Sequence, residues 1–176
     1  MRDMLFVSHA NPEDNEFALW LTRRLSADGY SVWCDNTRLL GGEDFWRVAE
    51  TAIRTRTYKF LYVLSKTSNV KDGPRNELQI AVNVAKTHKL HDFIIPLRVD
   101  DLPYTEMNIL LTRLIAIPFE IGWASGYQQL LTKLASELEW AIIIKQVGAR
   151  MDGWTRNVWR ARAAGYSWEE ISRLSY

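Results

Sequence analysis

The chain has little that would cross-link it or hold it in a membrane. Its 176 residues include one cysteine, Cys34, which excludes an internal disulfide and favours a reducing compartment. The longest apolar runs, such as 141–144, are far too short to cross a bilayer. Residues 1–3 lead directly into a strand-like run rather than a signal peptide. We therefore expect a cytoplasmic protein without a membrane partner.

Several kinds of reactive site also lack their residues. Gly41 and Gly42 match neither the dinucleotide fingerprint nor the P-loop spacing. His88 and His91 lie one helical turn apart, but no cysteine or third histidine stands at ligand spacing, so solvated histidines are expected. Cys34 ends a predicted strand and is interpreted as a core residue rather than a nucleophile. The sequence thus predicts no metal and no bound cofactor.

Acidic and basic residues are nearly equal in number, but they are unevenly distributed along the chain. The net charge is +1, and residues 141–176 carry six basic against three acidic residues, leaving −2 for residues 1–140. The larger part therefore lacks the basic face of a nucleic-acid-binding domain. The eight tryptophans imply either a well-filled core or a partner surface.

Short apolar runs alternate with amphipathic stretches along residues 1–140. Strands are predicted at 4–7, 30–34, 58–64, 93–99 (interrupted at Pro96) and 114–117. Helices are predicted from Asn11, as cap, to Gly29, around 45–53, from Asp72 onward, and at 127–140. This alternation predicts parallel βαβ units in a doubly wound sheet, with ligands beyond the carboxyl ends of the strands.

Residues 141–176 form a separate unit in this interpretation. Ser167 and Glu170 make a capping box, and 164–166 could turn between two short helices. The segment is a helical extension, the start of a further domain or, as a weaker alternative, a helix-turn-helix that reads nucleic acid. Trp154, Trp159 and Trp168 favour a further domain, because so short a segment cannot bury them alone.

Polar residues follow several predicted strands and should meet at one edge of the sheet. Ser8, His9 and Asn11 follow the first strand, Asp35 follows the second, and Glu77 follows the third. Each also has a structural explanation: Asn11 as a cap, Asp35 as a turn residue and Glu77 as an acid near a helix start. A phosphoacceptor receiver domain does not fit, because Ser8-His9 and Ser65 stand where its aspartates would be.

At these residues the sequence resembles a prokaryotic Toll/interleukin-1 receptor (TIR) domain over roughly residues 1–140. The resemblance rests on Phe6-Val7-Ser8-His9-Ala10, Gly29-Tyr30-Ser31-Val32-Trp33-Cys34-Asp35, Leu64-Ser65 and Asn76-Glu77-Leu78. Asp44-Phe45-Trp46 and Phe93-Ile94-Ile95-Pro96-Leu97 are most similar to TIR domains fused to an APAZ domain beside a short Argonaute.

This resemblance implies a flavodoxin-like five-stranded fold and, for enzymatic members, hydrolysis of NAD to nicotinamide and ADP-ribose or a cyclic product. Glu77 falls on the family's catalytic glutamate, and Phe45 and Trp46 fall near an aromatic placed against nicotinamide. Ser8 and His9 could position ribose or phosphate, and we include Asn11 and Asp35 among the expected substrate contacts. One carboxylate suffices chemically, because nicotinamide leaves as a neutral group from a cationic precursor.

The resemblance also implies partners. Residues 35–42 correspond to a loop that packs on a neighbouring TIR domain and completes the site; its expected contact residues are Asn36, Arg38, Leu39, Leu40, Gly41 and Gly42. The implied context is bacterial immunity, with a short Argonaute and its guide and target nucleic acid reached through a region outside this chain. Gly73 departs from the family, which often has tryptophan there, so a non-catalytic adaptor stays open as an alternative.

Overall fold

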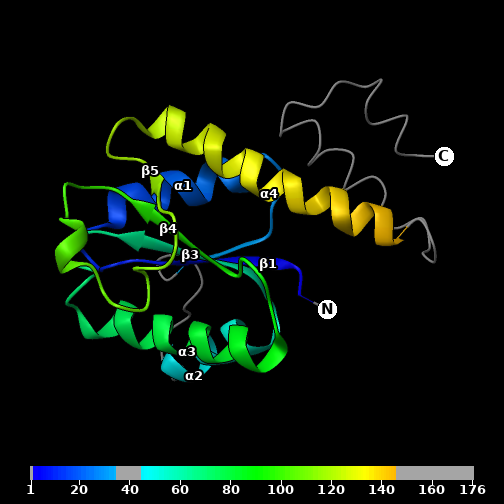
Figure 1. Ribbon diagram of the computed structural model, residues 1–176, viewed down its shortest axis with the longest axis horizontal. Helices are drawn as coiled ribbons and strands as arrows, with labels where there is room; N and C mark the ends of the chain where they lie inside the picture. The colour runs from blue at the N-terminus through cyan, green and yellow to red at the C-terminus, as the bar shows by residue number, and fades with distance from the viewer. Residues whose placement is uncertain (1, 35–44, 146–176) are drawn as a thin grey trace.

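The computed structural model describes residues 2–34 and 45–145, with side chains for 2–34 and 46–135. A five-stranded parallel sheet has the order β2-β1-β3-β4-β5, with helices packed on both of its faces (Figure 1). The strands are β1 (Met4–Ser8), β2 (Val32–Cys34), β3 (Thr57–Leu64), β4 (Ile94–Arg98) and β5 (Ile117–Pro118). The helices are α1 (Asn15–Ala27), α2 (Phe45–Thr55), α3 (Asp72–His88), the 3-10 turn η2 (Tyr104–Glu106) and α4 (Trp123–Lys145).

Two layers of buried side chains separate the sheet from its helices. Successive residues of β1 point to opposite faces of the sheet. Leu5 and Val7 pack toward α1 and α4, whereas Met4 and Phe6 pack toward α2 and α3. The second layer includes a stack of Trp33 on Phe6, with ring centroids 4.3 Å apart. The expected doubly wound, flavodoxin-like fold is confirmed by this arrangement.

The first helix begins later than the sequence predicted. Asn11 does not cap it: α1 starts at Asn15, Asp14 is the residue before it, and 11–14 form turns. Asp14 instead uses its carboxylate to accept the Ala10 N–H at 3.1 Å, which closes the turn between β1 and the helix. The predicted end was correct, because Gly29 adopts a φ of 86° immediately after the helix.

Two strands near the far edge also differ from their predicted form. Pro96 does not interrupt β4, because it pairs in register with Tyr62 while β5 covers only Leu97 and Arg98. Next to Pro96 the sheet is therefore an edge, where a missing N–H is tolerated. The strand predicted at 114–117 is only the two-residue β5, and α4 is longer than the predicted 127–140.

Candidate functional site

The site lies where the chain reverses its winding direction. β1 has β2 on one side and β3 on the other, so the loops leaving β1 and β3 diverge to opposite faces of the sheet. In sheets with this strand order, the crevice at such a switch point is where ligands bind. Ser8 ends β1 and Ser65 follows β3, and the structure brings both to this edge.

Glu77 lies in the second turn of α3, on the stripe that this helix buries against the sheet. Glu77 is only 5 % exposed, and it lies between the buried residues Pro74 and Leu78 in the sequence. Burial raises the pKa of the nearby Tyr62 hydroxyl to about 12, and the negative charge of Glu77 adds to that rise. A buried carboxylate therefore lies near Tyr62 of β3, and it is held there by a helix rather than a loop.

Ser8 places a hydroxyl on the same side of the sheet. It pairs in register with Tyr62 and lies two residues after Phe6, so its side chain points toward α2 and α3. The residue is 1 % exposed, and its Oγ has no hydrogen-bond partner within the described residues. A buried unpaired hydroxyl costs about 1–3 kcal/mol, which a bound ligand could recover by supplying a partner.

His9 is held in place by the start of α1. Its Nε2 lies 2.9 Å from Asn15 Oδ1, and Asn15 is oriented by donating its amide to Asn11 Oδ1 at 3.2 Å. Burial lowers the pKa of His9, although the Asn15 bond and the charge of Asp14 oppose that shift. At neutral pH the lowered pKa leaves the ring uncharged, and its Nε2 is already engaged by Asn15.

Asp14 and Ser65 form a hydrogen-bonded pair at this edge that the sequence analysis did not include among the site residues. Ser65 Oγ donates to Asp14 Oδ2 at 2.8 Å, and the same oxygen accepts the Ala10 N–H. The bond joins the loop after β1 to the loop after β3. Its only sequence signal is an acid just before a helix, and the competing cap assignment to Asn11 concealed it.

A second set of bonds fixes the loop that leads into α3. Ser68 Oγ accepts the Ser65 N–H at 2.9 Å, and Tyr62 donates its hydroxyl to the Ser68 carbonyl at 2.7 Å. Lys71, just before α3, reaches Glu13 at 2.8 Å and also donates to the Asn11 carbonyl. The position of Glu77 is thereby tied to the His9 loop from two directions.

Trp46 lies over the first turn of α3. It is 48 % exposed, and its Cη2 would be 3.5 Å from a Cβ built on Gly73. Gly73 stands one helical turn before Glu77. A half-exposed indole therefore covers the helix start beside the carboxylate, and it fills the place that a side chain at 73 would claim.

The remaining predicted site residues lie apart or outside the described residues. Asn11 is exposed and holds Asn15, so it is not brought into the crevice as Ser8 and Glu77 are. Phe45 begins α2. The following residues lie outside the described part of the chain: Asp35, Asn36, Arg38, Leu39, Leu40, Gly41 and Gly42.

Metal and membrane features were searched within residues 2–34 and 45–145. No group of three or more histidine, cysteine, aspartate or glutamate side chains there is arranged to hold a metal ion. In the same residues, no helix combines the length and the apolar character needed to cross a bilayer.

The structure is a flavodoxin-like domain with a buried carboxylate, a buried hydroxyl and a half-exposed indole near its switch point. The family described as TIR domain matches residues 5–131, and the chain belongs to that family. It is also similar to an uncharacterized protein, y4cD, of Sinorhizobium fredii (strain NBRC 101917 / NGR234), with 34 % identity over 134 residues. That match covers 76 % of this chain but only 20 % of the relative's length.

Proposed function

We propose that this TIR domain hydrolyses NAD at the bond between nicotinamide and ribose. The observation that carries the proposal is Glu77, a carboxylate 5 % exposed in the second turn of α3. The family supports the substrate, because TIR domains can be NAD hydrolases. No metal or bound cofactor is needed for the reaction proposed, and NAD enters as substrate.

The reaction requires little beyond a well-placed negative charge. The glycosidic bond breaks with its electron pair going to the pyridinium nitrogen, so nicotinamide leaves neutral and the ribose becomes an oxocarbenium-like cation. Glu77 would stabilise that cation and hold the ribose hydroxyls. Water then adds to the anomeric carbon and releases a proton, giving ADP-ribose; attack by a group of the same molecule gives a cyclic product.

Ser8 and Trp46 supply the complementary binding groups in this proposal. The Ser8 hydroxyl gains a partner from the substrate, which relieves its buried unpaired state. The positively charged nicotinamide ring of NAD would lie against the Trp46 indole, where a cation over an aromatic face gains about 1–2 kcal/mol. His9, whose ring is already fixed by Asn15, would shape the crevice from the other side.

The decisive measurement is nicotinamide release from NAD by the assembled wild-type protein and by Glu77→Gln in the same assembled state. Glutamine keeps the size of the side chain but removes the charge, so we expect a loss of about a hundredfold or more in kcat. Equal rates in the two proteins would overturn the proposal.

A non-catalytic adaptor is the second candidate function, and Gly73 is the observation that favours it. Many catalytic relatives carry tryptophan at that position, whereas this chain has no side chain there. An adaptor would bind other TIR domains, which such domains commonly do. Binding to a second TIR domain that survives Glu77→Gln, with no nicotinamide released by either protein, would establish this alternative.

We also propose the biological setting that the sequence resemblance suggests: a cytoplasmic immune effector of bacteria, which a short Argonaute with guide and target nucleic acid activates. Its support is the similarity around Asp44-Phe45-Trp46 and residues 93–97. In this setting head-to-tail contacts, including residues 35–42, would complete the site. Adding guide-loaded Argonaute and matching target should then raise nicotinamide release, whereas a mismatched target should not.

A further inference from the structure

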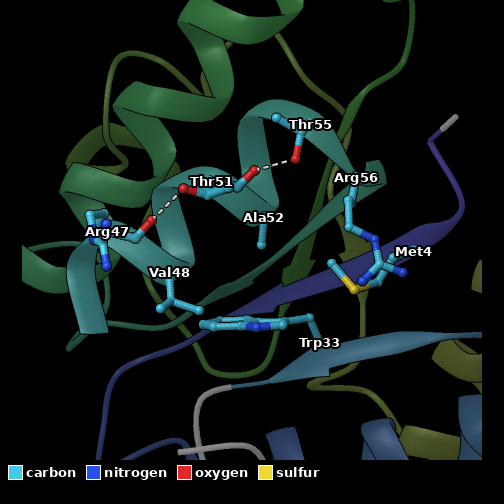
Figure 2. A pocket seen from close by; sticks show the side chains of 8 residues that line it. All are labelled: Met4, Trp33, Arg47, Val48, Thr51, Ala52, Thr55 and Arg56. Carbon is cyan, nitrogen blue, oxygen red and sulfur yellow. Dashed lines mark hydrogen bonds between the residues drawn. The ribbon is translucent and has the colours of Figure 1, made fainter. Parts of the chain in front are cut away.

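Hydroxyl groups on the α2/α3 face differ in what they hold. In α2, Thr51 donates to the Arg47 carbonyl and Thr55 to the Thr51 carbonyl, each at 2.7 Å, beside a pocket of about 480 Å³ (Figure 2). Bonds of this kind stay within one turn of the same helix and position nothing outside it. Tyr62 of β3 is fully buried, and it donates to the Ser68 carbonyl, beyond the end of its own strand, at 2.7 Å. Its hydroxyl therefore holds the connection between β3 and α3.

The Tyr62 bond continues a line of buried polar contacts along the carboxyl edge of the sheet. Ser65 and Ser68 are 3 % and 0 % exposed, and they bond reciprocally. Ser68 Oγ accepts the Ser65 N–H at 2.9 Å, and Ser65 Oγ accepts the Ser68 N–H at 3.0 Å. Ser65 Oγ in turn donates to Asp14 Oδ2 at 2.8 Å. Buried polar groups that are bonded to one another in this way specify one arrangement of the segments that carry them.

The connection passes without a break into the helix that carries Glu77. The Thr67 carbonyl accepts the Lys71 N–H at 3.0 Å, and the Lys71 carbonyl accepts the Arg75 N–H at 3.3 Å. Glu77 follows two residues later, in the second turn of α3. A displacement of residues 65–71 would therefore move the first turns of α3 and the carboxylate with them.

The Tyr62 hydroxyl lies near Glu77 without donating to it. Burial raises the pKa of Tyr62 to about 12, and the negative charge of Glu77 adds to that rise, which requires the two groups to be close. A phenol has a single hydrogen to donate, and Tyr62 gives it to the Ser68 carbonyl. Tyr62 is thus not available as a donor to Glu77 or to a ribose hydroxyl, and its influence on the carboxylate is through the connection.

We propose that Tyr62 is a positioning residue for Glu77: its bond to the Ser68 carbonyl fixes residues 65–71 and thereby sets where the carboxylate stands. The inference rests on the proposed NAD hydrolysis for its kinetic consequence, but not for the placement of the helix. A carboxylate that stabilises a short-lived ribose cation has to be held to within a fraction of an ångström, and residues that touch no substrate can provide that precision.

Tyr62→Phe removes the bond and keeps the ring. In the assembled protein, kcat for nicotinamide release should fall about tenfold, while KM for NAD should change by less than about twofold, because ground-state binding is retained. Ser65→Ala breaks the next link and should act in the same direction. The matched control is Tyr127→Phe on the opposite face: Tyr127 is 2 % exposed and donates to Asp28 at 2.6 Å. This control loses the same chemical group and should lose thermal stability, but it should keep the wild-type kcat.

Amide hydrogen exchange measures the placement of the helix independently of the reaction. In Tyr62→Phe and Ser65→Ala, the amides of 69–71 and of 76–78 should exchange about tenfold faster than in wild type, because both segments open locally. The same amides should be unchanged in Tyr127→Phe. Faster exchange confined to 69–71, or a wild-type kcat in Tyr62→Phe, would overturn the proposal. If no protein releases nicotinamide, the hydrolase proposal fails, whereas the exchange pattern still decides whether Tyr62 holds the helix of Glu77.

Discussion

The two faces of the sheet are both filled with buried side chains, but they use them differently. On the α1/α4 face, aromatic rings fill the space, with Phe17 edge-on to Phe119 at 5.0 Å and Tyr127 donating its hydroxyl to Asp28 at 2.6 Å. On the α2/α3 face, Glu77 and Ser8 are buried in the same layer as Phe6. Both faces therefore contribute a hydrophobic core, whereas the polar groups that a ligand would use are on the second.

The largest effect should come from crowding the filled face. A Cβ on Gly126 would lie 2.7–2.9 Å from three atoms of the Phe119 ring, so Gly126→Ala must push α4 away from the sheet. We expect a loss of about 2 kcal/mol in unfolding free energy, or roughly 4–8 °C in thermal midpoint. Nicotinamide release per folded molecule should be unchanged.

Gly122→Ala is the matched control for that substitution. A Cβ at Gly122 meets nothing within 4 Å, so the thermal midpoint should stay within about 1 °C of wild type. A similar loss in both variants would mean that glycine flexibility, rather than contact with Phe119, decides stability here.

The next effect tests the indole on the other face. Trp46→Ala should lower kcat/KM for NAD by about tenfold, corresponding to a cation–aromatic contact of about 1.4 kcal/mol. Because the exposed half of Trp46 contributes little to the core, the thermal midpoint should change little. Gly73→Ala is the control, since its Cβ would make only ordinary contact with Trp46 at 3.5 Å.

A combined variant can show whether Trp46 occupies the place of the tryptophan that many relatives have at 73. Trp46→Ala frees that place, so adding Gly73→Trp should restore most of the lost kcat/KM. Gly73→Trp alone should instead displace Trp46 and lower activity. If the combined variant is no more active than Trp46→Ala, Trp46 does not occupy the place of the tryptophan found at position 73 in relatives.

A smaller effect comes from two buried hydroxyls, one on each face. Ser8 Oγ and Thr22 Oγ1 both lack a hydrogen-bond partner within the described residues. Ser8→Ala and Thr22→Val each replace an unpaired hydroxyl by apolar atoms and should raise the unfolding free energy by about 1 kcal/mol. Only Ser8→Ala should raise KM for NAD, by a few fold. Equal kinetics in both variants would show that Ser8 makes no contact with substrate.

Features set by neighbouring residues along the chain could be predicted from the sequence. The stripe of Leu78 and Ala81 and the start at Asp72 located α3, and the resemblance then placed Glu77 in its second turn. The helix start at Asn11 was wrong because Asp14 is an equally good candidate there. Choosing between them depends on Ser65, which lies 51 positions away and comes close only when β1 and β3 pair.

The contact of Trp46 with Gly73 was beyond the sequence for the same reason. This contact depends on how α2 packs against α3, and the presence of a tryptophan at 46 does not predict a glycine neighbour at 73. Residue patterns thus located the carboxylate but not the surroundings that would give it a substrate.

The smallest effect concerns Asp14, which joins the loops of the two faces. Burial raises the pKa of Asp14 more than Ser65, the Ala10 N–H and the charge of His9 lower it. The folded protein therefore holds this proton more tightly than the unfolded chain, and the contribution to stability falls as pH rises through the window above 3.8.

Asp14→Asn keeps an oxygen for both hydrogen bonds and cannot ionise. Urea unfolding across that window should show that the unfolding free energy of Asp14→Asn rises relative to that of wild type as pH increases. Asp101→Asn should change in the opposite direction, because the hydrogen bond from Lys66 lowers the pKa of Asp101. Parallel curves for Asp14→Asn and wild type would mean that Ser65 and Ala10 fully compensate the burial of the charge.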